Sequence, residues 1–158
     1  MKRILGLDYG LRRVGIAVCD PDRRMASPVD VYQRRNERLD ATYFRSLVAE
    51  FNIDRLVVGL PLLGHGAEGD SAGQARRWGN WLSEQTGIPV SFVDERYSTV
   101  EAEELLRSSG VKASRRRSLR DMIAAQLLLQ AFLDAGCPDS DSPPAPLDDP
   151  ASDPEEDD

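Results

Sequence analysis

Short apolar runs and longer amphipathic segments alternate over most of the chain. The apolar runs have the length and composition of strands and cover residues 3–8, 14–19, 25–32, 56–60 and 90–93. Apolar residues spaced three and four apart predict four helices, which begin after Asp40, near Asp70, at Ser98 and at Ser118. The predicted order is therefore three strands, a helix, a strand, a helix, a strand and two helices.

This order predicts an α/β fold with a mixed sheet. A short turn joins the first two strands into a hairpin, whereas the later strands are joined through helices and should run parallel. We therefore expect a five-stranded sheet with helices on both faces. Pro28 cannot donate to a sheet ladder, so it marks an edge or an irregularity in the third strand.

The composition changes sharply after residue 135. Residues 136–158 contain nine acidic residues, six of the ten prolines and no basic residue. Such a segment cannot offset the entropy lost on ordering, and we predict that it is a disordered acidic tail. Residues 1–135 then form the single domain, and they hold all 20 basic residues but only 18 of the 27 acidic ones. The formal net charge of -7 therefore conceals a slightly basic domain.

The composition also argues against membrane and disulfide-rich classes. No apolar stretch reaches the roughly 18 to 20 residues of a membrane span, and the first residues do not read as a signal peptide. We therefore expect a cytoplasmic protein that makes no membrane contact. Cys19 and Cys137 lie far apart and match neither a zinc site nor a disulfide framework.

Four carboxylates lie where the predicted fold would gather side chains. Asp8 ends the first strand, Asp94 and Glu95 end the last one, and Asp121 begins the final helix. Ligand sites of open α/β sheets lie at the carboxyl ends of the strands. Taken singly, Asp8 could be a turn residue and Asp121 a helix-start residue, but their joint placement favours a common site.

A cluster of carboxylates has a specific chemical requirement. Two of them about 4 Å apart repel by roughly 4 kcal/mol at an effective dielectric near 20, so the cluster needs a cation or a raised pKa. Oxygen ligands without His or Cys favour Mg²⁺ or Mn²⁺. A pair of such ions can activate a water and stabilise the leaving oxygen of a phosphodiester, which is nuclease chemistry.

Four motifs, in this order along the chain, resemble the YqgF/RuvX family. They are residues 6–10 with 13–17, residues 58–62 before a glycine-rich loop, residues 94–99 with 101–102, and Asp121 with residues 124–125 and 129–130. Together they span nearly all of residues 1–135 and leave the tail outside. The loop departs from the family pattern, because residues 63–66 read LGHG where a polar segment is usual.

The resemblance implies a ribonuclease H-like fold and a metal-dependent nuclease. The implied role is maturation of the 5′ end of pre-16S ribosomal RNA in ribosome biogenesis, with Holliday junction resolution as the alternative. Carried over by position, it implies that Asp8, Glu95 and Asp121 are the catalytic carboxylates and bind Mg²⁺ or Mn²⁺. Only one of Asp94 and Glu95 should face Asp8, since neighbouring side chains at a strand end point in opposite directions, and we favour Glu95. Arg96 either binds the scissile phosphate or pairs with a carboxylate.

Basic residues flank these carboxylates in the sequence. Those expected to bind nucleic acid, besides Arg96, are Arg12, Arg13, Lys112, Arg115, Arg116, Arg117 and Arg120. Such groups supply most of the sequence-independent affinity for nucleic acid. His65 is interpreted as a bystander rather than a proton-transfer group.

The aromatic residues give little sign of a base-binding surface. Trp78 and Trp81 are interpreted as core and helix-face residues rather than stacking platforms. Tyr9 and Tyr97 remain as the aromatic candidates near the site.

The residues leave the substrate and the assembly open. The partner is a ribosomal RNA precursor, a ribosomal particle or branched DNA, since no residue demonstrably reads a 2′-hydroxyl group. The chain is either a monomer or a homodimer. An ATP-binding protein of the actin and sugar-kinase type is disfavoured, because the chain has one domain and no repeat. A noncatalytic nucleic-acid-binding module is disfavoured because all three carboxylates are present.

Overall fold

A mixed sheet forms the centre of the protein. A computed structural model gives the fold and describes residues 2–61, 69–94 and 112–138. The strands are β1 (Arg3–Tyr9), β2 (Arg13–Cys19), β3 (Ala26–Gln33), β4 (Ile53–Leu60) and β5 (Val90–Asp94). They lie in the order β3-β2-β1-β4-β5, with β1 antiparallel to β2 and parallel to β4. The predicted five-stranded mixed sheet is confirmed.

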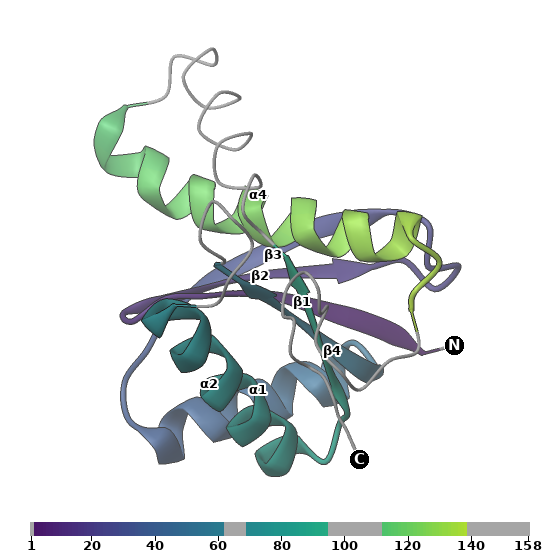
Figure 1. The fold of residues 1–158 in the computed structure, drawn as a ribbon, viewed down its shortest axis with the longest axis horizontal. Helices are drawn as coiled ribbons and strands as arrows, with labels where there is room; N and C mark the ends of the chain where they lie inside the picture. Colours follow the sequence, from purple (N-terminus) through teal and green to yellow (C-terminus); the bar gives the residue numbers. More distant parts are fainter. Residues whose placement is uncertain (1, 62–68, 95–111, 139–158) are drawn as a thin grey trace.

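Helices cover both faces of this sheet, as the strand order predicts. Helices α1 (Glu37–Glu50) and α2 (Asp70–Thr86) lie on one face, and α4 (Ala113–Asp134) crosses the other (Figure 1). The predicted helix that starts at Ser98 and the predicted tail beyond residue 138 lie outside the described residues. Within the described ranges, every helix is too short or too polar to cross a membrane.

Strand alternation gives the sheet two separate cores. On β1, Leu5 and Leu7 pack with α1 and α2, whereas Ile4 packs with α4. The α1 and α2 core contains large aromatic residues such as Phe44 and Trp78. Alanines and leucines dominate the α4 core.

The start of α1 corrects one prediction from the sequence. Asn36, not Asp40, is the N-cap residue, and its Oδ1 accepts a hydrogen bond from Leu39 N at 2.9 Å. Asp40 lies inside the first turn and is 4% exposed. Its Oδ1 accepts hydrogen bonds from Tyr32 Oη at 2.6 Å and Arg35 N at 2.9 Å. The carboxylate thus joins the helix to the end of β3 instead of capping the helix.

The start of α4 corrects a second prediction. The helix begins at Ala113 and not at Ser118, the start that the sequence predicts, so residues 113–117 belong to it. Lys112 is the N-cap residue and makes no side-chain capping bond. Arginine favours the helix, and packing against the sheet stabilises α4 even though no side chain caps its start.

The third strand behaves as its proline predicts. It is an edge strand, and its pairing with β2 shifts register between Ile16 and Ala17, where Ala17 lies opposite Pro28.

Candidate functional site

Asp8 lies near the carboxyl end of β1, on the face that α4 covers. Residues two apart on a strand share a face, so Asp8 lies on the same face as Gly6 and Ile4, and Ile4 packs in the α4 core. Its partner across the β1–β2 ladder is Gly15. Asp8 and Gly15 therefore form a cross-strand pair directly below the N-terminal half of α4.

Gly15 allows α4 to approach the sheet at Asp121. A Cβ atom on Gly15 would lie 2.0 Å from the carbonyl oxygen of Asp121, so any other residue would displace the helix backbone. Further along α4, a Cβ atom on Gly6 would lie 2.7 Å from Cβ of Leu129. These two close approaches fix the height of α4 above the sheet and bring Asp121 to the end of β1 that carries Asp8.

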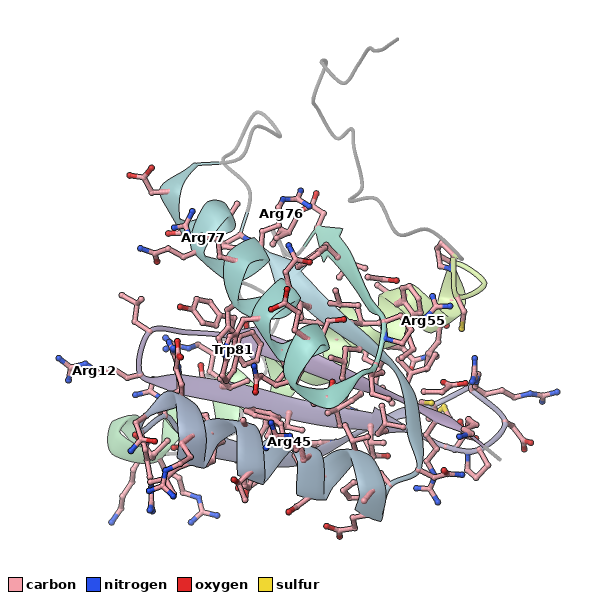
Figure 2. All side chains as sticks on the ribbon, turned by 90° about the horizontal axis from the view of Figure 1, so that it is seen from below. Arg12, Arg45, Arg55, Arg76, Arg77 and Trp81 are labelled. Atoms are coloured by element: carbon pink, nitrogen blue, oxygen red, sulfur yellow. The ribbon has the colours of Figure 1, made fainter. Side chains whose placement is uncertain are left out.

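Asp8 and Asp121 line one cavity of about 380 Å³. The turn between β1 and β2 supplies most of the remaining wall, including Arg12. Arg13 at the start of β2 and Arg120 on α4 complete it. The cavity therefore combines two carboxylates with three guanidinium groups. Arg12 is exposed and projects outward from the turn (Figure 2).

Arginines flank the carboxylate of Asp121 on both sides. Nε of Arg13 donates to Oδ2 at 2.8 Å, and Nε of Arg120 lies 3.8 Å from Oδ1. The Arg13 and Asp121 side chains are only 24% and 14% exposed, so solvent screens this pair less than a surface pair. Arg13 thereby holds the Asp121 side chain in one orientation.

Asp94 belongs to the opposite face of the sheet. Phe92 packs in the α1 and α2 core, whereas Val93 packs against the α4 core. Alternation places Asp94 on the face of Phe92, and its ladder partner is Leu60, which also belongs to the α1 and α2 core. Asp94 thus points away from the face that carries Asp8. Glu95 and Arg96 lie outside the described residues.

The donor set suits a hard divalent cation, although it is partial. Within residues 2–61, 69–94 and 112–138, no three His, Cys, Asp or Glu side chains are grouped so that they could hold a metal ion. Asp8 and Asp121 supply oxygen ligands alone, which Mg²⁺ and Mn²⁺ prefer. A third carboxylate would have to come from outside these ranges.

The predicted basic residues divide into two groups. Arg12, Arg13 and Arg120 line the cavity. Lys112 and Arg115 are exposed at the N-terminal end of α4. Arg116 and Arg117 follow on the same helix, and their side chains, like the His65 loop, lie outside the described structure.

Arg34 is a structural residue of the site that the sequence analysis missed. Its Nη1 donates to Tyr9 Oη, Gly10 O and Leu11 O, each at 3.1 Å, and its backbone N donates to Arg12 O at 2.8 Å. Arg34 therefore fixes the turn that carries Arg12 and leads into Arg13 at the start of β2. Only its position directly after the third strand could have indicated a contact with the first hairpin.

The sequence matches a known protein family. It matches RuvX, described as Holliday junction resolvase, over residues 2–135. A protein of Rhodopirellula baltica is 39% identical over 133 residues, which are 84% of this chain and 77% of that protein. A protein of Anaeromyxobacter sp. is 42% identical over 132 residues, 84% of this chain and 96% of that protein. Both carry the name "Putative pre-16S rRNA nuclease".

Solved structures resemble this fold at low sequence identity. RuvC of T. thermophilus in complex with a Holliday junction substrate has a TM-score of 0.54 and 17% identity, covering 87% of this chain and 97% of that chain. Fowlpox virus resolvase with Holliday junction DNA has a TM-score of 0.53 and 8% identity, covering 86% and 99%. This likeness concerns the fold, and it confirms the ribonuclease H-like class implied by the motifs.

Proposed function

The chain belongs to the RuvX family, and we propose that it is a metal-dependent nuclease that hydrolyses phosphodiester bonds of structured RNA. The favoured substrate is the precursor of 16S ribosomal RNA, because relatives 39% and 42% identical to this chain carry that name. Its role would be maturation of the 5′ end of this RNA during ribosome biogenesis in the cytoplasm.

One observation carries the proposal: two carboxylates from distant parts of the chain share a cavity lined by arginines. Asp8 comes from β1 and Asp121 from α4, and Gly15 permits the contact that brings them to the same end of the sheet. Arg12 and Arg120 would attract a phosphate into this cavity.

We assign the metal to Asp8, Glu95 and Asp121. Strand alternation directs Asp94 to the other face, which favours Glu95 as the third ligand. When bound, Mg²⁺ or Mn²⁺ would activate the attacking water and stabilise the leaving oxygen. Arg13 positions Asp121 through its ion pair at 2.8 Å, and we assign phosphate binding to Arg12, Arg120, Arg96 and the basic start of α4.

Holliday junction resolution is the second candidate. The description of the matching family favours it, and the fold is that of T. thermophilus RuvC, whose structure contains such a junction. Paired cuts in a junction would require two copies of the site, so this reading also requires a homodimer.

The test is cleavage of labelled precursor ribosomal RNA beside a four-way DNA junction, with Mg²⁺ or Mn²⁺. Asp8→Asn keeps the size of the side chain and removes its charge, so it should abolish cleavage. Asp22→Asn removes the same charge from the exposed turn between β2 and β3 and should leave cleavage unchanged. Cleavage of the RNA alone supports the first candidate, and cleavage of the junction alone supports the second. Wild-type cleavage by Asp8→Asn would contradict both.

A further inference from the structure

The catalytic cavity is the first of three neighbouring cavities. Tyr9 lines it and also lines a second cavity of about 320 Å³ on the α1 and α2 side of the sheet. Glu37 and Trp81 line this second cavity and also a third of about 310 Å³ between α1 and α2. The second and third cavities together are called the α1–α2 groove. It begins next to the catalytic carboxylates and passes around the end of β1.

The charges of the groove favour an anion. Arg34 and Arg77 line the second cavity and Arg38 and Arg45 line the third, against Glu37 and Asp40. The carboxylate of Asp40 is buried and already accepts the hydrogen bonds from Tyr32 and Arg35. Among the described residues, Arg34 and Arg77 make no ion pair. Their positive charge is therefore available to a ligand.

Arg34 is held in place at the entrance of the groove. Its guanidinium lies 5.0 Å from the centre of the Tyr9 ring, and its Nη1 is fixed by three hydrogen bonds to the β1–β2 turn. Within the described structure, its buried Nε has no hydrogen-bond acceptor. A cation that is ordered in advance loses little entropy when a phosphate binds beside it.

Trp81 supplies a flat apolar surface in the same groove. Figure 2 shows it on α2, with Arg77 and Arg45 on its two sides, and each arginine lines a cavity together with Trp81. Trp78, in contrast, is 6% exposed and packs on Tyr9 and Phe44 in the core. Trp81 itself packs partly against the α1 and α2 core and is partly exposed. A partly exposed indole between guanidinium groups is the combination that binds unpaired nucleotides, with the base on the ring and the phosphate on the cation.

We propose that the α1–α2 groove binds a single-stranded extension of the nucleic-acid substrate. An unpaired base stacks on Trp81, and the adjoining phosphates lie near Arg34 and Arg77. The two cavities, of about 320 and 310 Å³, each have room for a small ligand such as one nucleotide. The inference rests on the proposed function, and it specifies the substrate further: an unpaired strand continues from the cleavage point. It also revises the interpretation of Trp81 as a helix-face residue without a role in binding.

The experiment measures binding of the full chain in EDTA, so that cleavage does not interfere. Fluorescence anisotropy compares a blunt RNA duplex with the same duplex carrying about ten unpaired uridines, a length typical of single-strand sites. We expect the extension to tighten binding about tenfold. Arg77→Gln should remove most of this gain, and Glu37→Gln should increase it. Arg24→Gln removes an exposed arginine at the opposite end of the sheet and should preserve the gain.

Tryptophan fluorescence gives a second readout that does not depend on charge. Binding of the extension should quench Trp81, and Trp81→Phe, which keeps an aromatic ring in the packing, should remove the quenching. Equal affinity for the two RNAs would overturn the proposal, as would equal loss of the gain in Arg77→Gln and Arg24→Gln. Extension-dependent binding in EDTA, together with no cleavage of either substrate in the assay with Mg²⁺ or Mn²⁺, would instead contradict the proposed function and leave the groove proposal standing. Cleavage in the assay with metal, together with no effect of the extension on binding, would support the proposed function and overturn the groove proposal.

Discussion

The two faces of the sheet pack against their helices through different kinds of side chain. On the α4 face, the residues of β1 and β2 closest to the helix are small, and a Cβ atom on Gly15 or Gly6 would collide with α4. On the α1 and α2 face, aromatic rings fill the space. Tyr32 and Tyr43 stack with their ring centres 4.0 Å apart, and Phe44 meets Trp78 edge-on at 5.7 Å.

This difference separates two tasks. Backbone contact on the α4 face allows little movement, and it sets Asp121 beside the strand that carries Asp8. Large rings on the other face pack well in the middle of the sheet but leave cavities at the carboxyl end of the central strand β1, beside Tyr9 and Trp81. We infer that the tight face positions the chemistry and the aromatic face provides room for binding.

The largest effect is expected from adding a methyl group on the face of the sheet that α4 covers. Gly15→Ala would push its Cβ atom into the carbonyl oxygen of Asp121, which belongs to the helix backbone and cannot rotate away. We expect a loss of about 3 kcal/mol in the free energy of unfolding, together with loss of cleavage. Denaturant unfolding and a cleavage assay measure the two effects.

A glycine on α2 is the matched control for this change. A Cβ atom on Gly73 would meet only the guanidinium of Arg77, at 3.5 Å. Gly73→Ala should therefore stabilise the helix by about 0.5 to 1 kcal/mol. If Gly15→Ala were as stable as wild type, close packing would not be what positions α4.

A smaller effect is expected from loosening the aromatic face. Phe44→Leu removes the edge-on contacts with Trp78, Tyr32 and Tyr43, and should cost about 1.5 kcal/mol of unfolding free energy. Cleavage per folded molecule should not change, because Phe44 lies on the face opposite Asp8. Both quantities are measured at a temperature where each protein is fully folded. Loss of cleavage in a folded variant would show that the two faces are coupled.

The smallest effect is an alkaline loss of stability on the aromatic face. Burial, together with the carboxylates of Asp40 and Asp30, raises the pKa of Tyr32 and of Tyr43 to about 12. The folded protein thus disfavours ionised tyrosine. Their contribution to stability is complete below the ordinary pKa of about 10 and is lost as the pH rises towards 12. Tyr43→Phe should flatten this decline in unfolding experiments at increasing pH, and an unchanged slope would contradict the assignment.

The sequence predicted the sheet better than the helix starts. Both faces of the strands are buried, so each strand appears as a short apolar run that can be recognised from neighbouring residues alone. The start of α4 depends on packing against the sheet, which no capping motif reports. Asn36 and Asp40 are equally good caps in sequence, and the hydrogen bond from Tyr32 on β3 explains why Asp40 has another role.

The candidate site likewise combines residues that the sequence predicted with contacts that it did not. Asp8 and Asp121 were predicted from their positions at the ends of elements, and the structure brings them to one cavity. The ion pair of Arg13 with Asp121 and the contacts of Arg34 with the β1–β2 turn join residues far apart in the chain. Sequence spacing carries no signal for such contacts, because they depend on how the hairpin and α4 meet.

The most direct test of the assignment of chemistry to the α4 face compares two adjacent carboxylates. Asp94 points to the aromatic face, and Glu95 is the next residue along the chain. Cleavage rates of precursor ribosomal RNA are measured for Asp94→Asn and Glu95→Gln under the same metal conditions. We expect Glu95→Gln to abolish cleavage and Asp94→Asn to retain it. Loss of cleavage in Asp94→Asn with activity retained in Glu95→Gln would contradict the assignment.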